Sequence, residues 1–359
     1  MEKCRKLYGL LREALWGIPF DEKISPNEAR QLIAVADKQT VAGLVIDMLI
    51  KKNIHMEQQT VFHAYGYLEQ IKQKNMLMNK EVTTFARLMK DTGTDYLIVK
   101  GQTLAALYPN PLTRTPGDID FLVKDYHYAA NILKEYWAIE LPNRLAEKEC
   151  AFSHATVLYE LHTYLIDFGS NRHKRYWEKM LAISKLETIT INDAEVRVME
   201  PTLYSAYIFL HLFFHFVLEG IGLRHLCDWA VIMHHYADKI DKEKMSVVLQ
   251  NVGFLKAFRA FGTVLVDMLG MKDFPLPLSE KDRRLQSRIV KDILQGGNFG
   301  RDNRYVKKVG LKYKAETMMI SVKNSFCYAT LAPKEMMLLL YRRFIVNLKL
   351  VVARIICKS

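Results

Sequence analysis

The sequence of 359 residues contains little cysteine: five residues, scattered along the chain. No pair has the two-residue separation typical of zinc sites, and an odd number leaves a disulfide framework incomplete. The sequence therefore argues against a disulfide-rich secreted domain and a zinc module, and we expect the reducing environment of the cytoplasm. The cysteines are Cys4, Cys150, Cys227, Cys327 and Cys357.

Long apolar runs are also scarce. Near the N-terminus, Arg12 and Glu13 interrupt the apolar run, so we expect no signal peptide. Only the stretch from Pro201 to Leu218 is free of charged residues over nearly the ~20 residues that a bilayer requires. Because His211 and His215 lie inside it, we expect a buried core helix and no transmembrane segment. Their spacing is that of a zinc helix, but without a Glu after His211 we expect histidines that line the core or a pocket.

Acidic residues are outnumbered, with 39 Asp and Glu against 51 Lys and Arg and a net charge of +12. Such a charge favours anionic partners, which include nucleotides, nucleic acid and acidic membrane surfaces. Much of the excess lies in the C-terminal third, in Lys281 to Arg284, Arg301 to Lys314 and the final segment. These segments either contact nucleic acid or form solvated helix faces, and composition does not separate the two.

Hydrophobic periodicity divides the chain into three regions. Residues 1–92 show the three-and-four spacing of amphipathic helices, and residues 93–200 alternate short apolar runs with short helical segments. Helical periodicity resumes over residues 201–359. The sequence therefore predicts an α+β fold, in which a small mixed sheet lies between an N-terminal helical segment and a C-terminal helical domain.

Two local signals predict where elements begin and turn. Ser25 and Pro26, followed by Glu28, are typical of a helix start with a capping serine. Between Leu186 and Met199, two segments of alternating polarity flank an Asn-Asp pair. This second pattern predicts a β-hairpin.

The segment from Tyr96 to Val123 carries the chemistry. A predicted strand ends at Lys100, Gly101 allows a tight turn, and a helix is predicted to begin near Gln102. Amide groups at the start of a helix lack partners within the helix, so such a turn can hold a phosphate. We therefore expect these three residues at a nucleotide phosphate, and Lys100 can contact it directly.

Asp118 and Asp120 are separated by one residue on a predicted strand, so both side chains point to one face. Their Cα atoms are then about 6.5 to 7 Å apart, which suits carboxylates that share two divalent ions roughly 3.5 to 4 Å from each other. Two-ion phosphoryl chemistry needs such a set. A third carboxylate is expected on a neighbouring strand, where Glu160 is the better candidate and Asp167 the weaker.

Four further residues each have more than one interpretation. Arg114 either contacts a nucleotide phosphate through its planar fork or forms a surface ion pair. Arg224 and Asp228, four residues apart on a predicted helix, either pair with each other or close the nucleotide cleft. His162 either orients a metal-bound Glu160 or binds substrate, or is an ordinary hydrogen-bonded strand histidine.

The sequence combines a glycine turn, a short helix, an arginine and a Gly-Asp-Ile-Asp strand, and further on a carboxylate is followed two residues later by a histidine. This combination resembles the nucleotidyltransferase superfamily with the DNA polymerase β type of catalytic fold. More closely, the chain resembles bacterial nucleotidyltransferase family proteins, over most of its length and most specifically over residues 96–123. The resemblance implies that Asp118, Asp120 and Glu160 bind Mg²⁺ or Mn²⁺ and that Gly101 marks the phosphate-binding turn. Two departures are Gln102, where Gly or Ser is usual, and Glu160, where Asp is more frequent.

The function implied is transfer of a nucleoside monophosphate from a nucleoside triphosphate to a hydroxyl of an unidentified acceptor, either a small molecule or a protein. One alternative is a protein of the same fold that has lost catalysis and holds a nucleotide or a partner. A second alternative, an RNA-directed enzyme, rests on the basic C-terminal third.

Overall fold

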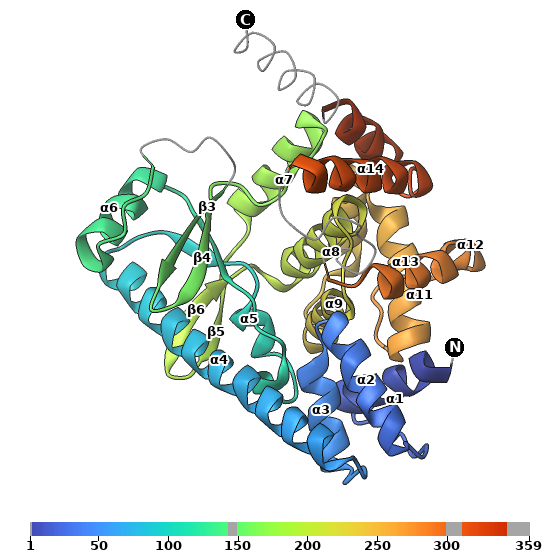
Figure 1. Cartoon of the computed structure of the whole chain (residues 1–359). Helices are drawn as coiled ribbons and strands as arrows, with labels where there is room; N and C mark the ends of the chain where they lie inside the picture. Colours follow the sequence, from blue (N-terminus) through green and yellow to red (C-terminus); the bar gives the residue numbers. More distant parts are fainter. Residues whose placement is uncertain (1, 143–148, 299–310, 343–359) are drawn as a thin grey trace, which may run out of the picture.

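The computed structural model describes residues 2–142, 149–298 and 311–342 (Figure 1). A small mixed sheet lies between helices from both ends of the chain, which confirms the predicted α+β class. Most of the basic segment 301–314 and nearly all of the final segment lie outside the described residues, so their contact with nucleic acid stays a prediction. The N-terminal helices are α1 (Glu2–Trp16), α2 (Pro26–Lys38), α3 (Ala42–Lys51) and α4 (Gln58–Asp91).

The four-stranded sheet has the order β1-β2-β4-β3, with β2 and β4 parallel and both outer pairs antiparallel. The predicted hairpin is present as a separate two-stranded sheet, β5-β6, whose turn holds Asn192 at a positive φ of 52°. The strands are β1 (Tyr96–Ile98), β2 (Ile119–Val123), β3 (Glu149–His154), β4 (Val157–His162), β5 (Glu187–Ile191) and β6 (Ala194–Val198).

Side-chain alternation gives the four-stranded sheet one apolar and one polar face. Ile119, Phe121 and Tyr159 are buried in a core shared with α4 and with α6 (Tyr126–Trp137). Phe85 of α4 lies at the centre, with its ring centroid 4.5 Å from that of Phe121. The alternate residues of β2 and β4, among them Asp120 and Glu160, point to the other face of the sheet.

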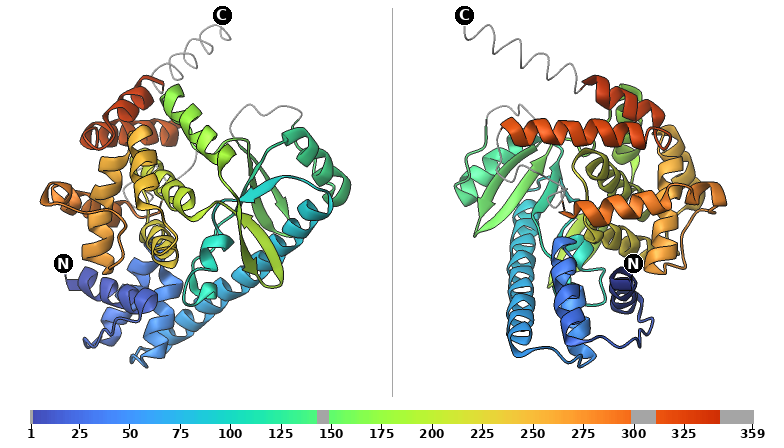
Figure 2. Two further views of the ribbon diagram at one scale, coloured as in Figure 1. Left: turned by 180° about the vertical axis from the view of Figure 1, so that it is seen from behind. Right: turned by 45° about the vertical axis from the view of Figure 1, so that its right-hand side comes forward.

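The remaining helices form the second half of the molecule, beside the sheet (Figure 2). Its centre is α8 (Pro201–Leu218), which is long and apolar enough to cross a membrane but has 83% of its 18-residue window buried inside the protein. This burial agrees with the predicted core helix. The others in this half are α7 (Asn171–Ile183), α9 (Leu223–His235), α10 (Lys242–Asn251), α11 (Leu255–Leu269), α12 (Glu280–Arg283), α13 (Gln286–Gly296) and α14 (Leu311–Cys327). The short helix α5 (Gln102–Ala105) and a 3-10 turn at Pro111–Thr113 connect β1 to β2 and pack against α4.

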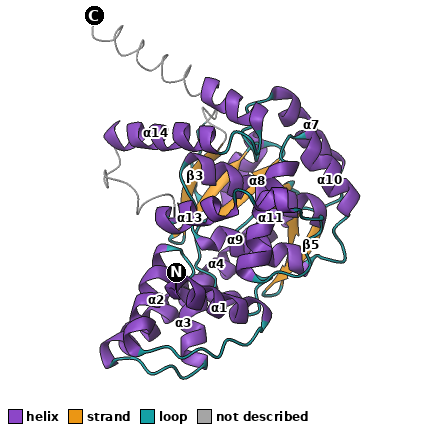
Figure 3. Cartoon of the chain, turned by 90° about the vertical axis from the view of Figure 1, so that its right-hand side faces the viewer, coloured by secondary structure: helices purple, strands orange, loops and turns teal. Residues whose placement is uncertain are grey.

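The N-terminal helices connect the two halves. α2 begins at the predicted start, with Ser25 as cap, and the structure shows a capping box in which Ser25 and Glu28 accept hydrogen bonds from each other's backbone amides. On α1, Arg12 donates to the carbonyl oxygens at the end of α11, and the Trp16 indole donates to Leu269 O at 2.6 Å. α4 then runs from this group along the sheet (Figure 2), and Figure 3 shows α1, α2 and α3 grouped at one end of the molecule.

Replacement of Phe85 by alanine tests the core between α4 and the sheet. The ring is completely buried, so Phe85→Ala should lower the free energy of unfolding by about 3–5 kcal/mol. Phe62→Ala on the same helix is the control, since that ring is 71% exposed and its loss should change stability by less than about 0.5 kcal/mol. Urea unfolding followed by circular dichroism measures both, and equal losses would contradict this packing.

Candidate active site

The turn after β1 depends on glycine. Gly101 has φ of 73°, and a Cβ there would lie 2.8 Å from the carbonyl oxygen of Asp118. Any other residue would be strained and would push the turn away from the start of β2. The contact therefore keeps Lys100 beside the aspartates.

The helix after this turn is shorter than a phosphate-binding helix usually is. α5 contains only four residues, Gln102–Ala105, so it has little helix dipole to offer an anion. The Gln102 side chain is buried and donates to Asn79 Oδ1 at 2.5 Å and Asn75 Oδ1 at 3.3 Å, both on α4. The structure therefore places this side chain outside the cleft, and only its backbone can serve the predicted phosphate contact.

Parallel pairing of β2 with β4 brings the predicted carboxylates together. Asp120 is the register partner of Glu160, and Asp118 immediately precedes β2. Oxygen or nitrogen atoms of Asp120, Glu160 and His162 all lie within 4.8 Å of one another. Asp167, the weaker candidate, instead pairs with Arg342 at 3.0 Å.

Asp120 is the most enclosed member of this group, with no exposed surface. Its Oδ1 accepts from Lys100 Nζ at 3.0 Å and lies 2.9 Å from His162 Nε2. Its Oδ2 is buried and has no hydrogen-bond partner among the described residues. A buried carboxylate oxygen without a partner is costly, and with nearby oxygen donors on Asp118 and Glu160 it fits a divalent cation.

The electrostatics reflect this crowding of charge. Burial and the charges of Asp120 and Asp118 raise the pKa of Glu160 from its usual 4.5 to about 7. Burial and Asp120 likewise raise the pKa of Asp118. Burial opposes ionisation of Asp120, but the charge of Lys100 and the hydrogen bond from His162 hold its pKa below the usual range. Burial alone would lower the pKa of Lys100, yet the aspartates raise it. The cluster therefore has more negative charge than Lys100 neutralises.

The opposite wall of the cleft is cationic. Arg114 is buried and forms a bidentate ion pair with Asp228, at 2.6 Å and 2.8 Å, and Tyr108 also donates to that carboxylate at 2.7 Å. The predicted surface ion pair of Arg114 is therefore wrong, because the pair lies inside the protein. The predicted pairing of Arg224 with Asp228 is also wrong: Arg224 Nη1 donates to Thr115 O at 3.1 Å.

These two arginines keep donors for a ligand. Arg114 Nη1 and Arg224 Nε are buried and have no hydrogen-bond partner within the described part of the chain. Burial and the charge of Arg114 lower the pKa of Arg224. An anion between the two guanidinium groups would satisfy the donors and reduce the repulsion between them.

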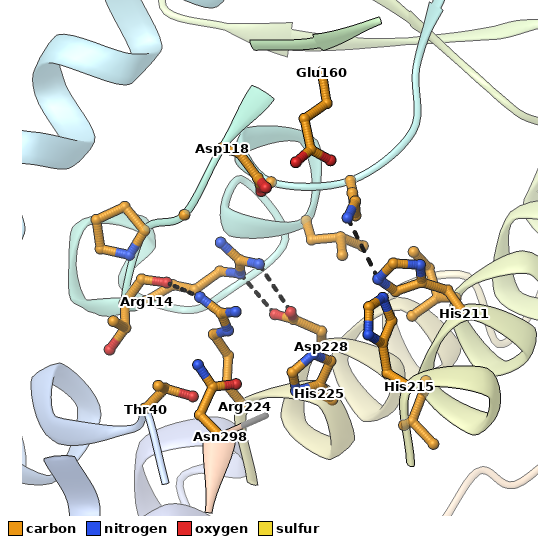
Figure 4. A pocket seen from close by; sticks show the side chains of 18 of the residues that line it. Thr40, Arg114, Asp118, Glu160, His211, His215, Arg224, His225, Asp228 and Asn298 are labelled. Carbon is orange, nitrogen blue, oxygen red and sulfur yellow. Dashed lines mark hydrogen bonds and ion pairs between the residues drawn. The ribbon is translucent and has the colours of Figure 1, made fainter. Parts of the chain in front are cut away.

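The acidic and cationic walls face each other across a cavity of about 390 Å³, which is within the range of small-ligand sites (Figure 4). The sheet supplies Asp118 and Glu160, and α8 and α9 supply His211, His215 and Arg224. Lys100 spans the cavity, since its Nζ lies 3.4 Å from His211 Nε2. The two histidines thus line a pocket, one of the roles predicted for them.

Several cleft residues were not predicted. Glu149 lies opposite His162 in β3, a strand whose weak apolar pattern gave no signal, and its Oε2 is 3.2 Å from His162 Nδ1. Thr40, His225 and Asn298 come from distant parts of the chain. Their positions in space depend on tertiary packing, which no local pattern encodes.

A sequence model of the family described as "uncharacterised nucleotidyltransferase" matches residues 25–270, which include both walls of the cleft. The chain belongs to this family. No curated protein matches the sequence. A solved structure from Paracoccidioides brasiliensis, an antigenic nucleotidyltransferase-like protein, is similar at 15% identity with a TM-score of 0.32. The match covers 54% of this chain and 92% of that one.

The family assignment agrees with the resemblance carried by residues 96–123.

The raised pKa of Glu160 makes the stability of this nucleotidyltransferase family member depend on pH. Ionisation of a carboxyl whose pKa rises on folding opposes folding, so the wild type should lose stability relative to Glu160→Gln as pH rises from 4.5. The difference should level off above about pH 7 and reach at most about 3 kcal/mol. Urea unfolding in EDTA across this range measures it. A difference that does not change with pH would contradict the raised pKa.

Proposed function

We propose that this protein is a metal-dependent enzyme of the DNA polymerase β type superfamily, which transfers a nucleoside monophosphate from a nucleoside triphosphate to an acceptor hydroxyl. The observation that carries the proposal is the close group of Asp120, Glu160 and His162 beside Asp118 in one cleft, with a buried Asp120 oxygen that lacks a hydrogen-bond partner among the described residues. The acceptor is a small molecule or a protein, and a bacterial, cytoplasmic setting belongs to the same proposal.

Each group of residues has a separate role in the proposed reaction. The three carboxylates would hold divalent ions, Mg²⁺ or Mn²⁺, which would supply a lowered pKa of the acceptor hydroxyl and neutralise charge on the phosphates. The acceptor hydroxyl would give its proton to water, its oxygen would form a bond to the α-phosphorus, and the bond from phosphorus to the bridging oxygen would break, so that pyrophosphate leaves. Arg114 and Arg224 donate to the phosphates from the other wall, and Lys100 can turn toward the phosphates when a cation replaces it at Asp120.

One observation favours the alternative of a binding protein without catalysis. Lys100 already neutralises Asp120 through the 3.0 Å ion pair, so the carboxylate cluster has a partner of its own. The RNA-directed alternative depends largely on basic segments beyond the described residues.

Nucleotide binding with pyrophosphate release tests the proposal. Calorimetric titration of each nucleoside triphosphate with Mg²⁺ or Mn²⁺ should show binding that weakens at least about tenfold in Asp118→Asn plus Asp120→Asn, since a metal bridge to the phosphates is lost. Pyrophosphate release should fall to background in this variant. Asp21→Asn is the control, because that side chain is 88% exposed and outside the cleft.

Metal-dependent binding without pyrophosphate release from the wild type, for every acceptor class tried, would support the binding protein. Binding that the double variant leaves unchanged would remove the carboxylates from the site and contradict both interpretations.

Arg224 provides a second test, on the opposite wall. Arg224→Gln should weaken triphosphate and pyrophosphate binding by about 10- to 100-fold, because a charged hydrogen bond to an anion is worth about 1.5–3 kcal/mol. Arg172→Gln, at an exposed position of α7, should leave both affinities unchanged. Equal affinities of the Arg224 variant and the wild type would show that the phosphates bind elsewhere. A thermal melt confirms that both variants are folded.

A further inference from the structure

We propose that His162 is itself a ligand of the metal in this cleft and that it makes the centre selective for Mn²⁺ over Mg²⁺. The inference rests on the proposed function, because it names the ion and a further ligand of the same site. It arises from the contacts of the two nitrogens of the imidazole ring.

The Nε2 atom of His162 faces the carboxylates. It lies 2.9 Å from Asp120 Oδ1 and 3.9 Å from Glu160 Oε2, within the group of three donor atoms that are no more than 4.8 Å apart. His162 and Glu160 are two residues apart in β4, so both side chains point to the same face of the sheet. An ion held between the carboxylates would therefore meet the imidazole as well.

The Nδ1 atom of the ring has a carboxylate neighbour of its own. Glu149 Oε2 lies 3.2 Å away, because Glu149 and His162 are register partners in β3 and β4. Metal-binding histidines commonly donate one ring N–H to a carboxylate, which fixes the tautomer and the ring orientation. In the structure Nε2 donates to Asp120, and Nδ1 has no hydrogen bond of good geometry among the described residues. If an ion takes the place of that contact, a small rotation of the partly exposed Glu149 side chain would let Nδ1 donate to it, which would leave the Nε2 lone pair for the ion.

The burial of Asp120 is a second observation that supports a cation beside His162. The side chain of His162 is 4% exposed and that of Asp120 is fully buried, so water has little access to either. Asp120 Oδ2 nevertheless lacks a hydrogen-bond partner among the described residues. A cation bound there would satisfy this oxygen, and Lys100 has a second contact, His211, toward which its ammonium can move.

The donor set determines which ion is preferred. Mg²⁺ requires oxygen ligands in a strict octahedron and loses its water reluctantly, whereas imidazole suits divalent transition metals. A set of carboxylates with one imidazole is therefore better matched to Mn²⁺ than to Mg²⁺. We expect Mn²⁺ to bind at least about tenfold more tightly in the absence of nucleotide.

Electron spin echo envelope modulation of the full chain loaded with MnCl₂ tests the bond directly. The wild type should show modulation from a coordinated imidazole nitrogen, and His162→Gln should lose it. His63→Gln, an exposed histidine on α4, should retain the signal. Bound Mn²⁺ without nitrogen modulation in the wild type would overturn the proposal, and so would the absence of Mn²⁺ binding.

Glu149→Gln is a second variant that keeps the ring and is easier to fold, because the Glu149 side chain is 34% exposed. Loss of an orienting carboxylate typically weakens metal binding 10- to 100-fold, so calorimetry should show this for Mn²⁺ and little change for Mg²⁺. Equal effects on both ions would argue for a general charge effect and against His162 as a ligand.

The inference and the proposed function fail in different ways. Pyrophosphate release with either ion, without a nitrogen signal, would overturn the role of His162 and leave the nucleotidyltransferase proposal intact. A nitrogen signal without any nucleotide binding would support the ligand role of His162 and contradict the proposed enzyme.

Discussion

Parallel pairing of β2 with β4 is the constraint on which the cleft depends. It places Asp120 opposite Glu160 and, through strand alternation, leaves Phe121 and Leu161 to pack under α4. A slip of one residue would turn the acidic side chains into the apolar core and the apolar side chains toward the cleft. The energy of the core therefore fixes the register, and the register fixes the distance between the carboxylates.

The two walls of the cleft handle buried charge differently. On the cationic wall, Arg114 and Asp228 compensate each other within the protein, at 2.6 and 2.8 Å. On the acidic wall, Lys100 is shared among several carboxylates, and the remaining repulsion appears in the raised pKa of Glu160. The negative charge of the acidic wall is thus only partly neutralised by the protein itself. Perturbed pKa values of this kind are common at functional sites.

Sequence patterns predicted the α+β class, the helix start with Ser25 as cap and the hairpin, because local propensity and alternation determine these elements. They also indicated Asp118, Asp120 and Glu160, although the roles of these residues stay predictions. Patterns failed where distant segments meet. The partners of Arg114 and Arg224 depend on how α9 packs against the sheet, and Glu149 lies in a strand with little apolar alternation.

The first helices touch both halves of the molecule but contribute little to the cleft, where Thr40 is their lining residue among those described. α1 is hydrogen-bonded to the end of α11, while α4, about 50 Å long at 1.5 Å per residue, holds the sheet. The distance between the sheet and α9 therefore depends in part on helices whose side chains lie mostly outside the cleft, through Gln39, which is hydrogen-bonded to the start of α9. Sequence changes in these helices can alter the width of the cleft while the charged side chains of both walls are preserved.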